Sequence, residues 1–343
     1  MPAAGIPLRT AAAYRGRFAD RRTLAMNDAP LFHAGELAVQ QRAGTRALVD
    51  SFAPRMLRDA MPLQHQQFFA QLPTLFVGSL DALRRPWASV LAGAPGFIDA
   101  QDAQHLRIRA PRDAADPLSQ HLAVGDPIGL LGLEPHTRRR NRLNGTVTQL
   151  DAQRIDVEVD QSFGNCPQYM QAREPRRVDA DEAFPARAEG TALSAEAMVL
   201  VQRADTLFIA SASPHARGHA GADGVDVSHR GGRPGFVRID TVDGRSVLTV
   251  PDYRGNRIFN TLGNIAAHPH AGLLFIDYER GDLLQLTGDA ELVWDGPALQ
   301  AFDGAQRLLR LHVEAGVWRP GALPLRWSPA ELASQLAQGG PDH

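Results

Sequence analysis

Residues 228–269 read SHRGGRPGFVRIDTVDGRSVLTVPDYRGNRIFNTLGNIAAHP, and the fold is inferred outward from this stretch. The dipeptide Asp243-Gly244 separates two β-like arms and is a strong hairpin signal. A glycine-rich segment precedes the first arm, and a loop rich in hydrogen-bond donors, 252–257, follows the second. An apolar segment, 262–267, then predicts a short helix that ends before a proline. This order predicts antiparallel strands joined by short turns, with one helix among them.

The chain contains a second copy of this pattern. Three pairs of segments recur in the same order: 74–79 (TLFVGS) and 206–211 (TLFIAS), 95–98 (PGFI) and 234–237 (PGFV), and 129–131 (GLL) with 143–145 (LNG) against 272–274 (GLL) with 286–288 (LTG). The offset between partners grows slowly along the chain, as a duplication followed by loop insertions would leave it. Both copies contain short apolar strands punctuated by Gly and Pro. The sequence therefore predicts an α+β, mainly β protein with two tandem antiparallel barrels and peripheral helices.

The repeat divides the chain into five expected segments. These are an N-terminal helical extension (1–60), a first barrel (61–170), a charged surface linker (171–190), a second barrel (191–320) and a C-terminal helix (321–343). A helix is expected before the first strand of each copy, at 62–72 and at 194–203, with Ser194 as the N-cap of the second. The C-terminal helix is expected to open at the capping box Ser328-Pro329-Ala330-Glu331 and to end near Gly339.

Composition limits the classes of function. The 343 residues are 44% hydrophobic and 22% charged, which is typical of a globular protein with more than one core. The net charge of −2 argues against nucleic acid as a partner. No apolar segment is long enough to cross a bilayer, and the N-terminus lacks a signal-peptide core. The single cysteine, Cys166, cannot form an internal disulfide, so a cytoplasmic location is expected.

Two loops of the quoted stretch form a candidate anion site. Ser228, Arg230 and Arg233 lie on the glycine-rich segment, where backbone N–H groups and guanidinium groups can approach a phosphate closely. The loop 252–257 adds two arginines and an asparagine, and it leads into the N-terminus of the expected helix near Asn260. A solvated loop of common turn residues is the alternative interpretation, and the residues alone leave both open.

The same stretch resembles the FMN-binding core of the pyridoxamine phosphate oxidase-like flavoproteins. The matching elements are 228–231 (SHRG), 234–237 (PGFV), 251–257 (PDYRGNR) and 264–269 (NIAAHP). Weaker elements at 85–90 and 95–97 extend the similarity into the first copy, so that it covers about residues 60–320. The resemblance implies two tandem split β-barrels of Greek-key type, FMN as cofactor and oxidoreductase activity.

The resemblance also implies roles for particular residues. The FMN phosphate would be held by Arg254, Asn256, Arg257 and Asn260, aided by Ser228 and Arg230. Backbone groups at Pro234, Gly235, Phe236 and Val237 would border the isoalloxazine ring. The loop of the first copy, placed at 116–126, has no arginine or lysine, so one FMN per chain is expected.

The first copy contributes an arginine-rich segment, 136–142. On a strand, Arg138, Arg140 and Arg142 would share one face. These side chains either form a solvated or ion-paired face, or Arg140 or Arg142 reaches the flavin or an anionic substrate across the barrel interface.

Several further assignments stay open. Cys166 is expected to be buried, with a position beside the flavin as the alternative. The spacing of His215 and His219 does not predict a metal site, because Pro214 and Gly218 argue against a helix there. No catalytic residue is assigned. The alternatives to FMN are a deazaflavin-dependent reductase and a non-catalytic flavin- or haem-binding protein. A homodimer that uses an electron donor such as NAD(P)H is expected.

Overall fold

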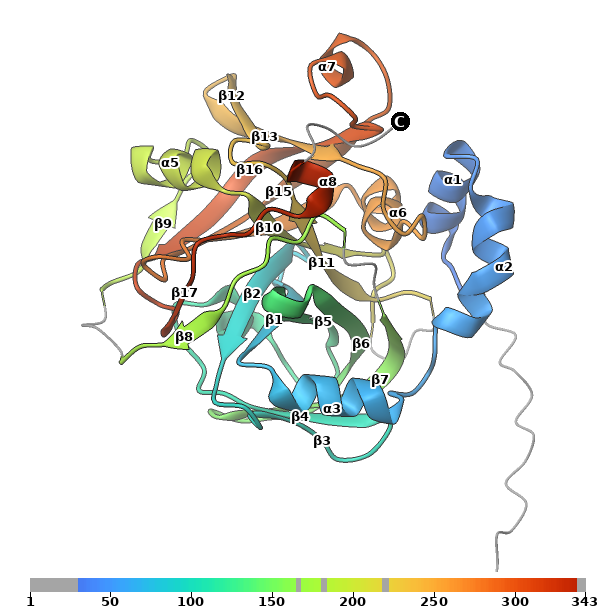
Figure 1. Cartoon of the computed structure of the whole chain (residues 1–343), viewed down its shortest axis with the longest axis vertical. Coiled ribbons are helices and arrows are strands. Elements are labelled where there is room, and N and C mark those ends of the chain that lie inside the picture. The colour runs from blue at the N-terminus through green and yellow to red at the C-terminus, as the bar shows by residue number, and fades with distance from the viewer. Residues whose placement is uncertain (1–29, 165–167, 180–183, 218–221, 338–343) are drawn as a thin grey trace, which may run out of the picture.

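The computed structural model describes residues 30–164, 168–179, 184–217 and 222–337. Two large antiparallel sheets dominate it, one in each half of the chain (Figure 1). The first sheet contains β1 (Thr74–Leu80), β2 (Pro86–Ala92), β3 (Ile98–Ala100), β4 (His105–Arg109), β5 (Pro127–Glu134), β6 (Arg139–Leu150) and β7 (Arg154–Gly164). The second contains β9 (Arg187–Glu189), β10 (Thr206–Ala212), β11 (Val225–Gly231), β12 (Arg238–Val242), β13 (Arg245–Asp252), β14 (His270–Ile276), β15 (Leu283–Val293) and β16 (Arg307–Arg319).

The two sheets have the same topology. The strand order is β2-β1-β5-β6-β7-β4-β3 in the first and β11-β10-β14-β15-β16-β13-β12 in the second. One irregularity also recurs, because the ladder between β6 and β7 shifts register at Asn144/Gly145 and the ladder between β15 and β16 shifts at Thr287/Gly288. The sheets are open rather than closed cylinders. They confirm the predicted fold class, which is mainly β with two split barrels.

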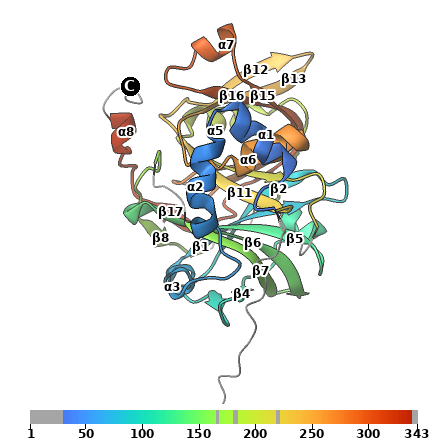
Figure 2. The same ribbon diagram turned by 90° about the vertical axis from the view of Figure 1, so that its right-hand side faces the viewer.

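Helices lie at the ends and outer faces of the sheets (Figures 1 and 2). They are α1 (Ala34–Arg42), α2 (Arg46–Met56), α3 (Leu63–Gln71), α4 (Pro117–His121), α5 (Ala195–Arg203), α6 (Asn260–Ala267), α7 (Pro297–Gln300) and α8 (Ser334–Ala337), with the 3-10 turn η1 (Pro135–Thr137). The helices predicted before each first strand are α3 and α5. Ser194 is the N-cap of α5, as predicted, and its Oγ accepts a hydrogen bond from the N–H of Ala197 at 3.3 Å.

The halves share a hydrophobic core between their sheets. Phe76 on β1 and Phe208 on β10 stack there with ring centroids 3.6 Å apart and an interplanar angle of 13°. Both side chains are almost fully buried. The sheets approach so closely that a Cβ on Gly272 would lie 2.4 Å from the carbonyl oxygen of Pro86. The repeated Gly-Leu-Leu segments on β5 and β14 therefore allow backbone-to-backbone contact between the copies.

The segment 171–190, which is predicted as a surface linker, is mostly exposed in its described part but also pairs with the fold at several points. Gln171 is buried, and its side chain donates to the carbonyl of Gly232 at 3.0 Å. The strand β8 (Pro175–Arg177) pairs with β17 (Leu325–Trp327), and β9 pairs with β16. The segment is held because strand edges offer unpaired backbone groups, which local composition does not reveal.

The capping box at Ser328 does not open a helix. The hydroxyl of Ser328 instead accepts a hydrogen bond from the N–H of Glu174 at 3.0 Å, and Glu331 forms a β-bridge with Ala172. Between residues 321 and 337, helical structure is confined to α8. Tertiary backbone pairing overrides the local helix signal here. The five-segment division of the chain stays a prediction, and Cys166, His219 and the expected helix end at Gly339 lie outside the described residues.

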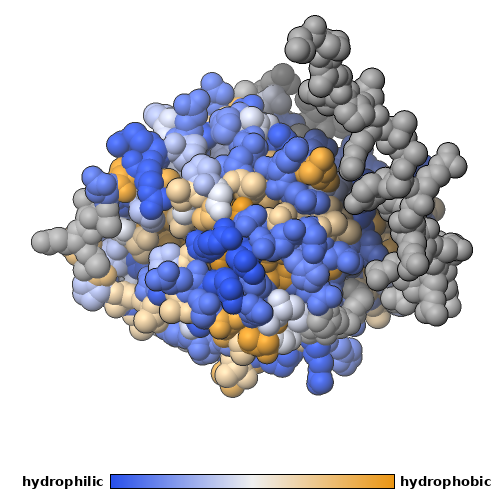
Figure 3. All heavy atoms as spheres, turned by 90° about the horizontal axis from the view of Figure 1, so that it is seen from below, coloured by the Kyte–Doolittle hydropathy of each residue, from blue (hydrophilic) through white to orange (hydrophobic). Residues whose placement is uncertain are grey.

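Among the described residues, no helix combines the length and the apolar character that crossing a bilayer requires. The face seen from below in Figure 3 is largely hydrophilic, with small separate hydrophobic areas.

Candidate functional site

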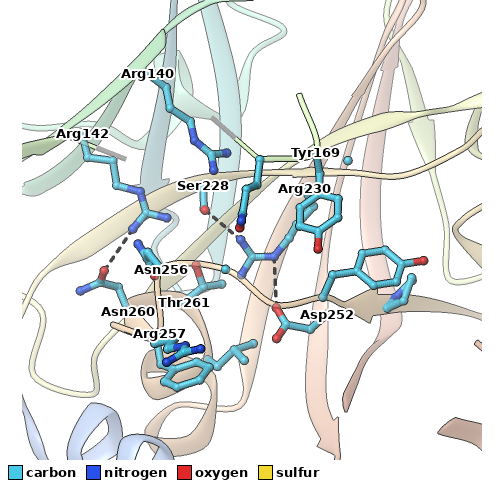
Figure 4. Close-up of a pocket in the computed structure, with 17 residues that line it drawn as sticks. Arg140, Arg142, Tyr169, Ser228, Arg230, Asp252, Asn256, Arg257, Asn260 and Thr261 are labelled. Carbon is cyan, nitrogen blue, oxygen red and sulfur yellow. Dashed lines mark hydrogen bonds and ion pairs between the residues drawn. The ribbon is translucent and has the colours of Figure 1, made fainter. Parts of the chain in front are cut away.

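A pocket lies between the halves, where β6 faces β11, the end of β13 and the start of α6 (Figure 4). The pocket opens to solvent, and the space within it that water can occupy is about 90 Å³. Its polar and aromatic lining comprises Arg140, Arg142, Gln168, Tyr169, Ser228, Arg230, Asp252, Tyr253, Asn256, Arg257, Phe259, Asn260 and Thr261. The structure thus brings together seven of the predicted residues: Ser228, Arg230, Asn256, Arg257, Asn260, Arg140 and Arg142.

Arg142 ties the two halves together at the pocket wall. Its Nη1 donates to the carboxylate of Asp226 at 2.9 Å and to Oδ1 of Asn260 at 3.2 Å. Both members of the ion pair are buried. Burial lowers the pKa of Arg142 and raises the pKa of Asp226, while their mutual attraction opposes both shifts. The pair fixes a guanidinium group of the first half against the helix start of the second.

Arg230 forms the opposite wall. Its Nη1 donates to Oγ of Ser228 at 3.0 Å, and its Nε lies 3.7 Å from a carboxylate oxygen of Asp252. The same carboxylate lies 3.5 Å from Nε of Arg307. Burial raises the pKa of Asp252, and the two arginines oppose that rise. Asp252 thereby orients Arg230 toward the pocket while its own charge is shared with Arg307.

Arg140 meets a neutral histidine. Its Nη1 lies 3.1 Å from Nδ1 of His229, which is buried. Burial, together with Arg140, Arg230 and Arg173, holds the pKa of His229 well below its usual range. The neutral ring accepts the hydrogen bond at Nδ1, so His229 supports Arg140 without adding charge.

The loop 253–259 positions the start of α6. Arg257 and Phe259 both have positive φ angles of 65°, a conformation that turns the chain sharply. Oδ1 of Asn256 accepts a hydrogen bond from the N–H of Ile258 at 3.1 Å and stabilises that turn. The N-cap position of α6 is occupied by Phe259, whose side chain has no polar atom for capping. The N-terminal N–H groups and their partial positive charge thus face the pocket at Asn260 and Thr261.

Glu36 on α1 contacts the pocket residue Asn260 and was not predicted from the sequence. Nδ2 of Asn260 donates to its Oε1 at 2.6 Å, and the N–H of His33 donates to its Oε2 at 3.0 Å. Burial raises the pKa of Glu36 to about 8. Glu36 lies outside the repeat in a segment without a recognisable motif, so no signal in the sequence marked it. Figure 2 shows α1 and α2 alongside α6.

Other predicted residues lie outside the pocket lining. Phe236 and Val237 are buried in the core of the second sheet. Pro234 and Gly235 form the turn before them, and a Cβ on Gly232 would collide with Phe236 just as one on Gly93 would collide with Phe97. The repeated Pro-Gly-Phe motif therefore builds the same turn in both halves. Arg254 is exposed and does not line the pocket.

The remaining arginines of the candidate loops behave differently from expectation. Arg138 lies before β6 with a φ of 54° and donates to the carbonyl of Met170, so it does not share a strand face with Arg140 and Arg142. Arg233 donates to the carbonyl of Leu336.

The loop of the first half was placed wrongly at 116–126. The equivalent of 253–259 is the loop before α4, which ends at Asp116 and contains Arg112. The error arose because α4, which begins at Pro117, was not expected.

Comparisons with known proteins support the family. Residues 193–333 match the family model described as pyridoxamine 5'-phosphate oxidase. The search of curated proteins finds no match. Similar solved structures include a putative pyridoxamine 5'-phosphate oxidase from Lactobacillus delbrueckii (11% identity, 31% of this chain and 95% of that chain, TM-score 0.26) and the heme storage protein HutZ from Vibrio cholerae (14%, 38% and 95%, 0.26). A FAD-binding protein from Mesorhizobium loti is similar at 15% identity, over 39% of this chain and 99% of that chain, with a TM-score of 0.23. Residues 193–333 thus match a pyridoxamine 5'-phosphate oxidase family model, which supports the pyridoxamine phosphate oxidase-like family for this part of the chain.

Proposed function

We propose that this chain binds FMN in the pocket between its halves and acts as an FMN-dependent oxidoreductase. The observation that carries the proposal is the concentration of positive charge: Arg140, Arg142, Arg230 and Arg257 line one pocket. Among the described lining residues, the single carboxylate is that of Asp252, which is engaged by Arg230 and Arg307. A dianionic phosphate would balance this excess.

The donors present fit a phosphate group. Nε of Arg142 is buried and has no hydrogen-bond partner among the described atoms, although its Nη1 donates to Asp226 and Asn260. An arginine buried in this way lacks an acceptor that a phosphate oxygen in the pocket can supply. The N-terminus of α6 adds backbone donors on the same wall.

The aromatic part of the lining fits a planar ring. Tyr169 and Tyr253 stack with centroids 5.3 Å apart, and both line the pocket. An aromatic wall of this kind favours a flat ring system such as isoalloxazine. When bound, FMN would supply hydride and electron transfer. The chain would hold the phosphate with Arg230, Arg257 and the start of α6, and would orient the ring beside the tyrosines.

Haem binding is a second candidate, because a similar fold belongs to a heme storage protein. A haem site requires an axial ligand, usually a histidine. None of the described lining residues is a histidine; His229 adjoins the lining, but its Nδ1 faces Arg140 and its side chain is buried. The arginine-rich lining therefore favours a phosphorylated flavin over haem. A deazaflavin with a phosphorylated side chain is the alternative within the enzymes.

The test is the absorption spectrum of the purified protein, with the released chromophore identified by mass. We expect two flavin bands and FMN. Arg257→Ala and Asn256→Ala should each weaken FMN binding about tenfold or more, because each loses a direct or positioning contact to the phosphate. Arg254→Ala is the matched control, since this neighbouring arginine is exposed and outside the lining, and it should bind FMN normally.

A Soret band or a deazaflavin mass would replace the cofactor and leave the pocket. A colourless protein that does not take up added FMN would refute the proposal. We also propose NAD(P)H as electron donor, a homodimeric assembly and a cytoplasmic location. Flavin bleaching by NAD(P)H without oxygen, sedimentation velocity and cell fractionation test these in turn.

A further inference from the structure

The first half contains a counterpart of the pocket, and the strand registers identify its residues. Ser89 on β2 and Ser228 on β11 each lie three residues before the residue that pairs with the first threonine of the preceding strand. Arg142 on β6 and Gln285 on β15 each pair with the second leucine of a repeated Gly-Leu-Leu segment. Ser89 is thus the equivalent of Ser228, and Gln285 of Arg142.

A carboxylate of the chain itself lies at the centre of this counterpart. Oδ1 of Asp116 accepts hydrogen bonds from Oγ of Ser89 at 2.6 Å and from Nε2 of Gln285 at 3.2 Å. Its Oδ2 accepts from Nη1 of Arg319 at 2.7 Å. All four side chains are almost fully buried, with exposed fractions between 0% and 5%. Two donors come from the second half, just as Arg140 and Arg142 reach the other pocket from the first.

The helices α4 and α6 occupy equivalent places in the two halves, and their N-cap residues differ. Asp116 is the N-cap of α4, and its side chain accepts a hydrogen bond from the N–H of Leu118. The corresponding position before α6 is Phe259, which leaves the helix start open to the pocket. The first half therefore has a built-in anion at the position where the second half has none.

We propose that the Asp116 carboxylate permanently occupies, in the first half, the anion position that a ligand phosphate takes in the second. This inference rests on the proposed function only in treating the second-half pocket as an anion site. The first-half site is then a copy whose anion position is filled by the chain itself, which explains a stoichiometry of one ligand per chain.

The charge balance of the cluster makes the inference testable. Arg319 is buried, and its second partner, Asp113, is half exposed. Without the Asp116 carboxylate, Arg319 and Gln285 would border a cavity about as large as the group removed. The guanidinium group of Arg319 would then lack its buried counterion. A buried guanidinium group that loses its counterion favours binding of a small anion from solution.

The experiment is rescue of Asp116→Ala with sodium formate, which is the carboxylate that the substitution deletes. Melting temperatures of the full chain are compared in formate and in sodium chloride at equal ionic strength. Formate at about ten times its dissociation constant should raise the Tm of Asp116→Ala by about 2–4 °C above the chloride value. The wild-type chain supplies the baseline, because its second-half pocket also meets formate.

Two further variants keep the test decisive. Asp116→Ser retains a helix-capping oxygen, so it covers a failure of Asp116→Ala to fold, and it should show the same excess response. Asp116→Ala combined with Arg319→Gln should lose the response, because the buried cation is gone. A response to formate no greater than in the wild type, or insolubility of both single variants in formate and chloride alike, would overturn the inference. FMN content of the same wild-type sample is measured separately, so failure of the flavin proposal is distinguishable.

Discussion

Replacement of Arg142 by methionine should destabilise the folded chain strongly, because it leaves Asp226 buried without its counterion. The methionine fills a similar volume, so that the lost charge dominates the effect. Asp226 and Arg142 are both buried and lie 2.9 Å apart, which places the pair in the class whose disruption costs about 3–5 kcal/mol. The exposed pair of Arg238 and Asp240 is the matched control, and Arg238→Met should cost less than about 1 kcal/mol.

The penalty should depend on pH in a definite direction. Burial raises the pKa of Asp226, and Arg142→Met removes the main group that opposes this rise. The folded variant then binds a proton that the unfolded chain, with an aspartate pKa of about 3.9, releases. Its stability is therefore lower at neutral pH and recovers as the pH falls toward 5.

Urea unfolding at pH 7 and pH 5 measures both effects. The double variant Arg142→Met/Asp226→Asn removes both charges and should recover most of the stability lost by Arg142→Met. Since both variants lack Arg142, any lost ligand affinity is common to them. Equal destabilisation of the single and double variants, or a penalty that does not change with pH, would refute the buried-pair argument.

Two other predictions concern the contact between α1 and α6. The pKa of Glu36 is raised to about 8 from its usual 4.5, so between these values the folded chain binds a proton that the unfolded chain releases. The Tm of the wild type should therefore fall as the pH rises from 5 to 8, and Glu36→Gln should reduce this dependence. Parallel profiles of Tm against pH for the two proteins would contradict the prediction. Gly263→Ala should lower the free energy of unfolding by about 1–3 kcal/mol, because a Cβ there would lie 2.5 Å from Cα of Glu36. Gly190→Ala, which meets nothing within 4 Å, is the control in urea unfolding, and equal effects of the two would argue against close α1–α6 packing.

The duplication could be predicted from the sequence because both copies use the same short motifs for the same local structures. The Gly-Leu-Leu segments permit close approach of the sheets, and the Pro-Gly-Phe motif builds the same turn twice. Such constraints act on neighbouring residues, so the same residue types recur at the same spacing in both copies. The motif 251–257 likewise marked a loop that does line the pocket through Asn256 and Arg257.

The rest could not be predicted because it depends on contacts between segments distant in the chain. Nothing local distinguishes Arg254, which is exposed, from Arg257, which lines the pocket. The helix predicted from the capping box at Ser328 does not form, because this segment pairs with Glu174 and Ala172, more than a hundred residues away in the sequence. The role of Glu36 depends on the packing of α1 on α6, which places its carboxyl group beside Asn260.

Local sequence patterns were sufficient to predict a duplicated, mainly β chain with an arginine-rich loop in its second copy. Periodicity, turn residues and repeated motifs act over a few residues, and they can be recognised without coordinates. Three-dimensional packing was needed to show which arginines lie together, that Arg142 of the first half pairs with Asp226 of the second, and that Asp116 accepts a hydrogen bond from Arg319. Electrostatic and hydrogen-bonding energies depend on distance and burial in space, and chain folding alone sets both.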